Sequence, residues 1–154
     1  MVSDTNDGRI PPELLKKRLL ALLETRKGEF APSNPEIDKY EHSLQCATRA
    51  LKAGEPPDYV VMALFHDVFG GFDAESHGWM LNMVLNPYLK LHARAAVSTH
   101  EASMAELRAP AMPGTKRMNS SRTFASNYDM PSFDPNYPSL PLDHFLPIID
   151  EVIK

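Results

Sequence analysis

Apolar residues recur at helical spacing along most of this chain. Leucines between Leu14 and Leu23 form a stripe that begins after Pro11 and Pro12 and ends before Gly28. Because proline suits the first turn of a helix and glycine the position after the last, these residues bound a helix. The same reasoning predicts helices over about 11–27, 37–53, 59–69, 74–85 and 87–107, and shorter ones over 122–129 and 142–153. No alternation is long enough for a sheet, so the predicted fold class is all-α.

Proline, serine and asparagine concentrate between these periodic segments and predict loops over 28–35, 109–120 and 130–142. The chain has 154 residues, 43% of them hydrophobic, which is enough for one core without disulfides. Residues 1–10 precede the first predicted helix, and we expect them to form a flexible tail. A single helical domain of about five core helices, with Pro-rich C-terminal loops, would follow over 11–154.

Charge and composition narrow the possible partners. The formal net charge is −4, and a basic stripe typical of nucleic-acid binding is missing. No apolar run approaches the roughly 18 residues of a membrane span, and the first residues lack the basic and apolar regions of a secretory signal. We expect a cytoplasmic protein without nucleic-acid or membrane partners. Its single cysteine, Cys46, is expected to pack in a helix and to have no chemical role.

Histidine and aspartate interrupt several of the apolar helices. His42 stands alone on one, and the His66-Asp67 pair stands in an otherwise apolar run on the next. Burying such groups is costly without a partner. A metal ion is a suitable partner, since imidazole and carboxylate both bind first-row metals. A helical bundle could bring six such side chains to one point: His42, His66, Asp67, His77, His100 and Asp129.

The adjacent His66 and Asp67 favour two ions rather than one. Neighbouring helical residues point about 100° apart, which lets His66 bind one ion while Asp67 reaches between two. A bridging carboxylate commonly holds metals roughly 3.5–4 Å apart. No catalytic residue beyond the ligands is predicted, and His92 and His144 are expected to be packing or surface residues.

This order of histidines and aspartates resembles the HD-domain superfamily of metal-dependent proteins. The segments EHSLQCA (41–47) and ALFHD (63–67) are similar to the HD-type mixed-valent diiron oxygenases, notably the phosphonate-cleaving ones. The segment FASNYD (124–129) is similar to myo-inositol oxygenases. The resemblance implies an HD-type bundle with an Fe²⁺/Fe³⁺ pair. Such a pair would use O₂ to oxidise or cleave a small polar organic substrate.

The resemblance also implies which residues bind each iron. His42, His66 and Asp129 would bind one iron, and His77 and His100 would bind the other. Asp67 would bridge the two. Three positions depart from the phosphonate-cleaving branch. Where that branch has basic or histidine side chains, this chain has Gly70, Met104 and Ser126. Groups suited to clamping a phosphonate dianion are missing, so we expect a less anionic substrate.

Other residues are candidates for the surroundings of the metals. Glu29 ends a segment similar to one that guards the second iron in the family, and Tyr40 is a candidate for the guarding aromatic. An oxygen-binding iron needs a dry pocket, which aromatic and apolar side chains help to line. The candidates are Phe65, Phe69, Phe72, Trp79 and Met80, with Met104 and Ser126 at the departing positions.

Two further functions remain open. An HD-type phosphohydrolase would use Mn²⁺ or Mg²⁺ to act on a phosphate ester or nucleotide, usually with Lys or Arg near the leaving group. Few basic residues surround the motifs here. A degenerate, metal-free HD domain could serve as a binding module, but its decay would be expected to remove ligands first. The sequence carries no prediction of oligomeric state.

Overall fold

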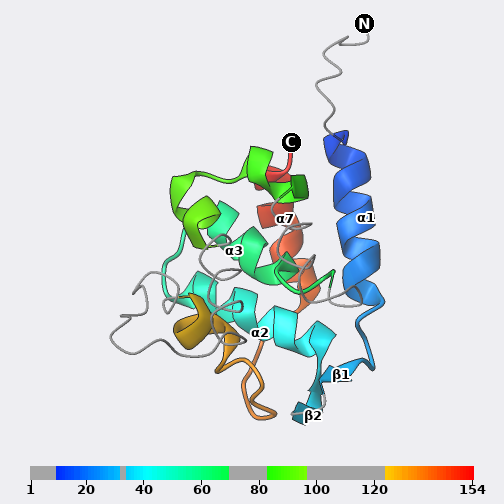
Figure 1. Ribbon diagram of the computed structural model, residues 1–154, viewed down its shortest axis with the longest axis vertical. Helices are drawn as coiled ribbons and strands as arrows, with labels where there is room; N and C mark the ends of the chain where they lie inside the picture. Colours follow the sequence, from blue (N-terminus) through cyan, green and yellow to red (C-terminus); the bar gives the residue numbers. More distant parts are fainter. Residues whose placement is uncertain (1–9, 32–33, 70–82, 97–123) are drawn as a thin grey trace, which may run out of the picture.

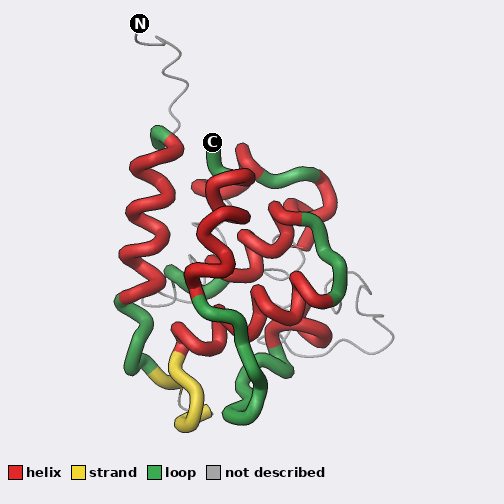
Figure 2. Tube along the Cα trace, turned by 180° about the vertical axis from the view of Figure 1, so that it is seen from behind, coloured by secondary structure: helices red, strands yellow, loops and turns green. Residues whose placement is uncertain are grey.

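The computed structural model describes residues 10–31, 34–69, 83–96 and 124–154, which form a mostly helical fold (Figure 1). Helix α3 (Pro57–Phe65) packs against both α2 (Lys39–Lys52) and α7 (Leu142–Val152). Helix α1 (Pro12–Glu24) lies beside α7, as Figures 1 and 2 both show. Lys16 links these two helices by a 3.0 Å hydrogen bond to Asp150. The fold therefore has α3 at its centre.

Helix α3 supplies the middle of the core because its side chains from Val60 to Phe65 are apolar on every face. All residues from Asp58 to Phe65 are buried, whereas α1 buries mainly the stripe that contains Leu15, Leu19 and Leu23. A helix that is hydrophobic all round has to be covered by other elements. None of the helices in the described part of the chain is long and apolar enough to cross a membrane.

A small hairpin precedes α2, where the sequence predicted a loop followed by a helix from Ile37. Strands β1 (Phe30–Ala31) and β2 (Asn34–Asp38) pair antiparallel and stand at one end of the molecule (Figure 2). Asp38 explains the later start of α2, because its carboxylate accepts the Glu41 N–H at 2.8 Å as an N-cap. The other carboxylate oxygen accepts the Gly28 N–H at 2.9 Å. One side chain thus closes the hairpin and begins the helix.

Helix α3 ends at Phe65, four residues before the predicted end. His66 and Asp67 therefore lie in the turn after the helix and not on it, which corrects the prediction. The imidazole of His66 donates from Nδ1 to the carbonyl of Ala63 at 2.7 Å. In a continuing helix that carbonyl would accept the N–H of Asp67. The side chain thus offers the last helical turn another hydrogen-bond partner, as is common at helix ends.

The helix predicted from residue 87 begins later as well. A short 3₁₀ helix η1 (Asn86–Tyr88) is followed by the extended residue Leu89, and regular helix covers 91–96. The buried carboxylate of Asp58 accepts the Lys90 N–H at 2.7 Å and fixes this break. The predicted final helix is confirmed by α7, and the predicted short helix near Asp129 is a π-helix, η2 (Ala125–Asp129). Residues 83–85, the end of the helix predicted over 74–85, are helical. The rest of that helix, residues 1–9 of the predicted tail and the loop over 109–120 lie outside the described residues.

Candidate metal centre

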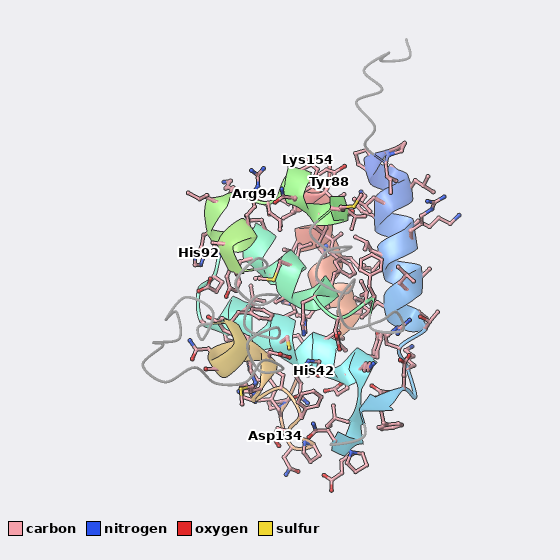
Figure 3. All side chains as sticks on the ribbon, viewed as in Figure 1. His42, Tyr88, His92, Arg94, Asp134 and Lys154 are labelled. Atoms are coloured by element: carbon pink, nitrogen blue, oxygen red, sulfur yellow. The ribbon has the colours of Figure 1, made fainter. Side chains whose placement is uncertain are left out.

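Three of the six predicted ligands come together from distant parts of the chain. His42 lies in the first turn of α2 (Figure 3), His66 follows α3, and Asp129 ends η2. The Oδ1 atom of Asp129 lies 3.0 Å from Nε2 of His42 and 3.3 Å from Nε2 of His66. One carboxylate oxygen and two ring nitrogens therefore face a common point.

Backbone carbonyls fix the orientation of both imidazoles. Nδ1 of His42 lies 2.9 Å from the carbonyl oxygen of Ser132, and Nδ1 of His66 bonds Ala63. A carbonyl can only accept, so each Nδ1 carries the hydrogen and each Nε2 of a neutral ring offers a lone pair. Both lone pairs then point at the Asp129 carboxylate, which is also an acceptor. Metal-binding histidines commonly use their second nitrogen in this way.

The electrostatics of this group of acceptors favour a positive charge between them. Burial lowers the pKa of His66, but the hydrogen bond and charge of Asp129 outweigh it and raise the pKa to about 9. Burial opposes the charged form of His42 too, yet Cys46 and Asp129 raise its pKa to about 10. Without metal, the site therefore retains protons on the imidazoles. A cation can take their place.

Aromatic rings enclose the two histidines. Phe133 stacks on His42 with the ring centroids 4.0 Å apart, and Phe124 meets His66 edge-on at 5.2 Å. The histidine side chains are 1% and 2% exposed, whereas that of Asp129 is 21% exposed. Solvent or a small molecule therefore reaches the cluster from the side of Asp129.

Side chains of α2 hold the segment 128–140 by hydrogen bonds. The amide of Gln45 donates to the carbonyl of Asp134 at 2.8 Å and accepts its N–H at 3.2 Å. Arg49 donates to the Pro131 carbonyl at 3.0 Å, and Ser139 donates to Glu41 at 2.6 Å. These bonds connect residues 82 to 98 positions apart. They hold Asp129 and the Ser132 carbonyl over the face of α2 that carries His42.

The thiol of Cys46 belongs to the cluster, although the sequence analysis assigned it no chemistry. Its Sγ lies 3.7 Å from Nε2 of His42 and donates to the carbonyl of Tyr128 at 3.3 Å. Ligand atoms of His42, Cys46, His66 and Asp129 all lie within 4.8 Å of one another. Burial raises the pKa of this thiol. The signal in the sequence was the spacing of four residues, which puts Cys46 and His42 on one helix face.

Of the other predicted ligands, only Asp67 lies in the described part of the chain, and it is not one of the four clustered residues. Asp67 is partly buried next to His66, and its charge contributes to the raised pKa of that histidine. His77 and His100 lie outside the described residues, as do Gly70, Phe72, Trp79, Met80 and Met104. His92 lies at the edge of the molecule (Figure 3), 2.8 Å from Glu55, and His144 is exposed, so both lie away from the site as expected.

The predicted pocket and guarding residues have varied positions. Phe65 and Phe69 are buried in the core, and Ser126 is exposed on η2. Glu29 forms ion pairs with Arg26 at 3.1 Å and Lys39 at 3.3 Å. The ammonium of Lys27 lies 4.7 Å from the ring centre of Tyr40. Both Glu29 and Tyr40 therefore interact with basic side chains around the hairpin.

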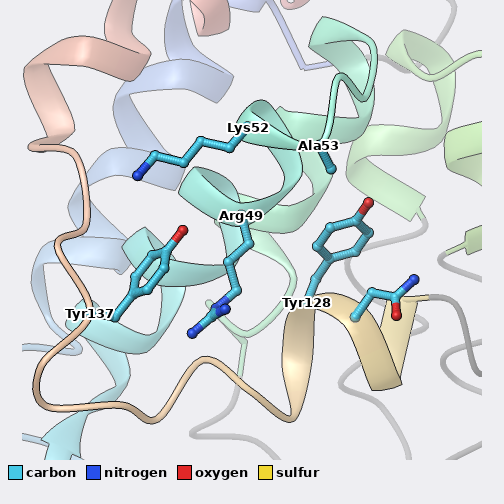
Figure 4. A pocket seen from close by; sticks show the side chains of 6 residues that line it. Arg49, Lys52, Ala53, Tyr128 and Tyr137 are labelled. Carbon is cyan, nitrogen blue, oxygen red and sulfur yellow. The ribbon is translucent and has the colours of Figure 1, made fainter.

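A surface pocket of about 370 Å³ is lined by residues that are close in sequence to Cys46 and Asp129 (Figure 4). None of the four clustered residues lines it. Cζ of Arg49 lies 3.9 Å from the ring centre of Tyr137, and Nζ of Lys52 lies 5.4 Å from it. Both residues belong to α2. Asn127 and Tyr128 of η2 complete the lining with Ala53. The guanidinium of Arg49 thus faces this pocket and the Pro131 carbonyl.

Comparison with known proteins adds no relative. The chain matches no described protein family, no curated protein and no solved structure. A functional proposal for this chain therefore depends on its own side-chain geometry and on the motif resemblance described above.

Proposed function

We propose that this protein is a non-haem iron oxygenase that uses O₂ to oxidise or cleave a small polar organic molecule. The observation that carries the proposal is the convergence of two imidazole Nε2 atoms on the Asp129 carboxylate. Two histidines and one carboxylate, with coordination positions left open, are the ligand set of many non-haem Fe²⁺ oxygenases. The donor set therefore fits iron.

Each part of the site has a defined task in this proposal. Asp129 supplies the negative charge that offsets the cation, and the Ser132 and Ala63 carbonyls keep both Nε2 lone pairs directed at it. Phe133 and Phe124 exclude water from the two imidazoles. Bound iron would supply redox chemistry, with O₂ as the oxidant and the substrate and an external reductant as electron sources.

The motif resemblance extends the proposal to a second iron. Asp67 directly follows His66, which suits a carboxylate shared by two ions. His77 and His100 would hold the second ion. An HD-type Fe²⁺/Fe³⁺ pair is therefore the form of the enzyme that we propose.

The alternative phosphohydrolase would require Mn²⁺ or Mg²⁺. These ions prefer carboxylate, carbonyl and water oxygens, whereas imidazole suits iron and zinc. Two of the three converging donors here are imidazoles. The described donor set thus favours the oxygenase over the hydrolase.

Metal content and oxygen consumption test the proposal together. The protein is loaded with Fe²⁺ without air, and O₂ uptake is followed with a reductant and a library of polyols, amino alcohols and small acids. We expect substrate-dependent uptake that His42→Ala abolishes. His144→Ala, which removes an exposed histidine, is the matched control and should keep full activity. Turnover of phosphate esters by the Mn²⁺ or Mg²⁺ form, without any O₂ uptake by the iron form, would reject the oxygenase.

A further inference from the structure

Cys46 occupies a position in the cluster that packing alone does not require. It follows His42 by four residues on α2, so the two side chains share one face of the helix. The thiol is fully buried, and its sulfur lies 3.7 Å from Nε2 of His42, the same nitrogen that faces Asp129. Histidine and cysteine at this spacing can hold one ion from a single helix.

The separations between the four ligand atoms match those of a metal site. With metal–nitrogen and metal–oxygen bonds of about 2.0–2.2 Å and a metal–sulfur bond of about 2.3 Å, tetrahedral ligand atoms stand roughly 3.3–3.6 Å apart. The observed separations are 3.0 Å and 3.3 Å from Asp129 to the histidines and 3.7 Å from His42 to Cys46. The longest separation in the group is at most 4.8 Å. A side-chain adjustment of about 1 Å would bring all four atoms to bonding distance of one ion.

We propose that Cys46 is the fourth protein ligand of the ion held by His42, His66 and Asp129. This inference rests on the metal site of the proposed function but not on its oxygen chemistry. On binding, the S–H bond breaks, sulfur forms a bond to the metal, and the proton leaves to solvent, because the thiolate is the ligand form. The hydrogen bond from Cys46 to the Tyr128 carbonyl is given up in this step.

A thiolate ligand defines which metals the site takes. Soft sulfur donors favour zinc, cobalt and iron, whereas Mg²⁺ and Mn²⁺ prefer oxygen. The site is therefore a mixed sulfur, nitrogen and oxygen centre. It discriminates against the two ions that the alternative hydrolase would use.

The single cysteine makes the experiment unambiguous, because any thiolate–metal signal has to come from Cys46. The full chain is loaded with one equivalent of Co²⁺ and, separately, of Zn²⁺. A near-ultraviolet thiolate-to-cobalt band and a sulfur shell at about 2.3 Å in X-ray absorption of the zinc form are expected. Cys46→Ser keeps a hydroxyl that can donate to the Tyr128 carbonyl and so preserves the local packing. It should lose both signals and bind Zn²⁺ at least about tenfold more weakly.

The outcomes separate this inference from the proposed function. Metal binding through nitrogen and oxygen alone, with a wild-type cobalt spectrum equal to that of Cys46→Ser, overturns the role of Cys46 and leaves the oxygenase standing. A sulfur shell in a protein that never consumes O₂ supports Cys46 and rejects the oxygenase. If Cys46→Ser does not fold, the X-ray absorption of the wild-type zinc form decides alone. A wild-type protein that binds neither ion overturns both proposals.

Discussion

Helices α2 and α3 are both largely buried, yet they bury different chemistry. The side chains of α3 from Tyr59 to Phe65 are all apolar, apart from the hydroxyl of Tyr59. The buried face of α2 includes His42, Ser43, Gln45 and Thr48. Burying apolar groups stabilises the fold directly, whereas each buried polar group needs a partner to avoid a net cost. Helix α2 therefore positions other residues along much of its buried face, whereas α3 does so through Asp58 in its first turn, which accepts the Lys90 N–H.

The partners of the polar groups in α2 show this difference. Thr48 donates to Leu44 in its own helix and accepts the N–H of Leu140 at 3.0 Å. Gln45 pairs with both backbone groups of Asp134. Hydrogen bonds fix direction as well as distance, so α2 specifies where the segment from Tyr128 to Leu140 lies. Helix α3 contributes close packing, and its one contribution to the cluster is His66 just beyond its end.

The largest expected effect comes from the apolar helix. Phe65 is completely buried, and Phe65→Ala should lower the free energy of unfolding by about 3–5 kcal/mol. Denaturant titration of the metal-free protein measures this change. If α3 only stabilises, the additional stabilisation on adding Zn²⁺ should equal that of the wild type within error. Loss of that metal-dependent increment would show that α3 also shapes the site.

Removing the carboxylates should affect metal content rather than packing. Asp129→Asn replaces the charged oxygen shared by His42 and His66 with a neutral amide, so the ion at those residues should be lost. Asp67→Asn should leave this ion in place and remove the second one, because Asp67 is the proposed bridge. Elemental analysis after dialysis gives the metal-to-protein ratio for each variant. Identical metal loss in the two variants would contradict the separate roles of the carboxylates.

A moderate effect is expected for the polar residue that positions the segment. Gln45→Leu would leave the backbone N–H of Asp134 without its partner, whereas the carbonyl keeps the Tyr137 N–H, and the expected cost is about 1–3 kcal/mol. Metal affinity should fall about tenfold as Asp129 loses its support. Ser43→Ala is the matched control, because the Ser43 hydroxyl donates only to Lys39 in the same helix. Equal changes in zinc affinity for both variants, by competition titration, would remove the positioning role.

The convergence of His42, His66 and Asp129 could be anticipated from sequence because polar residues in apolar helices are conspicuous. Cys46 was missed, because a cysteine on an apolar face looks like any small core residue and its spacing of four from His42 is a weak signal by itself. The early end of α3 and the late start of the helix at 91 depend on side chain–backbone bonds, from His66 to Ala63 and from Lys90 to Asp58. The second of these joins residues 32 positions apart, which no local pattern encodes. The two-residue strand β1 is too short for any alternation.

A pH dependence is expected on the polar side of the comparison alone. The pKa values of His66, about 9, and His42, about 10, lie above the ordinary histidine value of 6.5. From pH 6.5 up to these folded-state values, the folded, metal-free protein binds more protons than the unfolded chain. Its free energy of unfolding therefore falls as the pH rises through this range. The contribution is complete below pH 6.5 and lost as pH passes through 9 to 10.

Thermal unfolding from pH 6 to 10 in a chelator should therefore show a falling midpoint. Saturating Zn²⁺ should flatten the fall, because the cation replaces the protons between the imidazoles and Asp129. Phe65→Ala should lower the whole curve and keep its slope, since the phenylalanine side chain carries no titratable group. Asp129→Asn should make the slope shallower, because the carboxylate raises the pKa of both rings, whereas Cys46 also raises that of His42. A slope as steep in Asp129→Asn as in the wild type would assign the pH dependence to other groups and leave the two helices indistinguishable by this measurement.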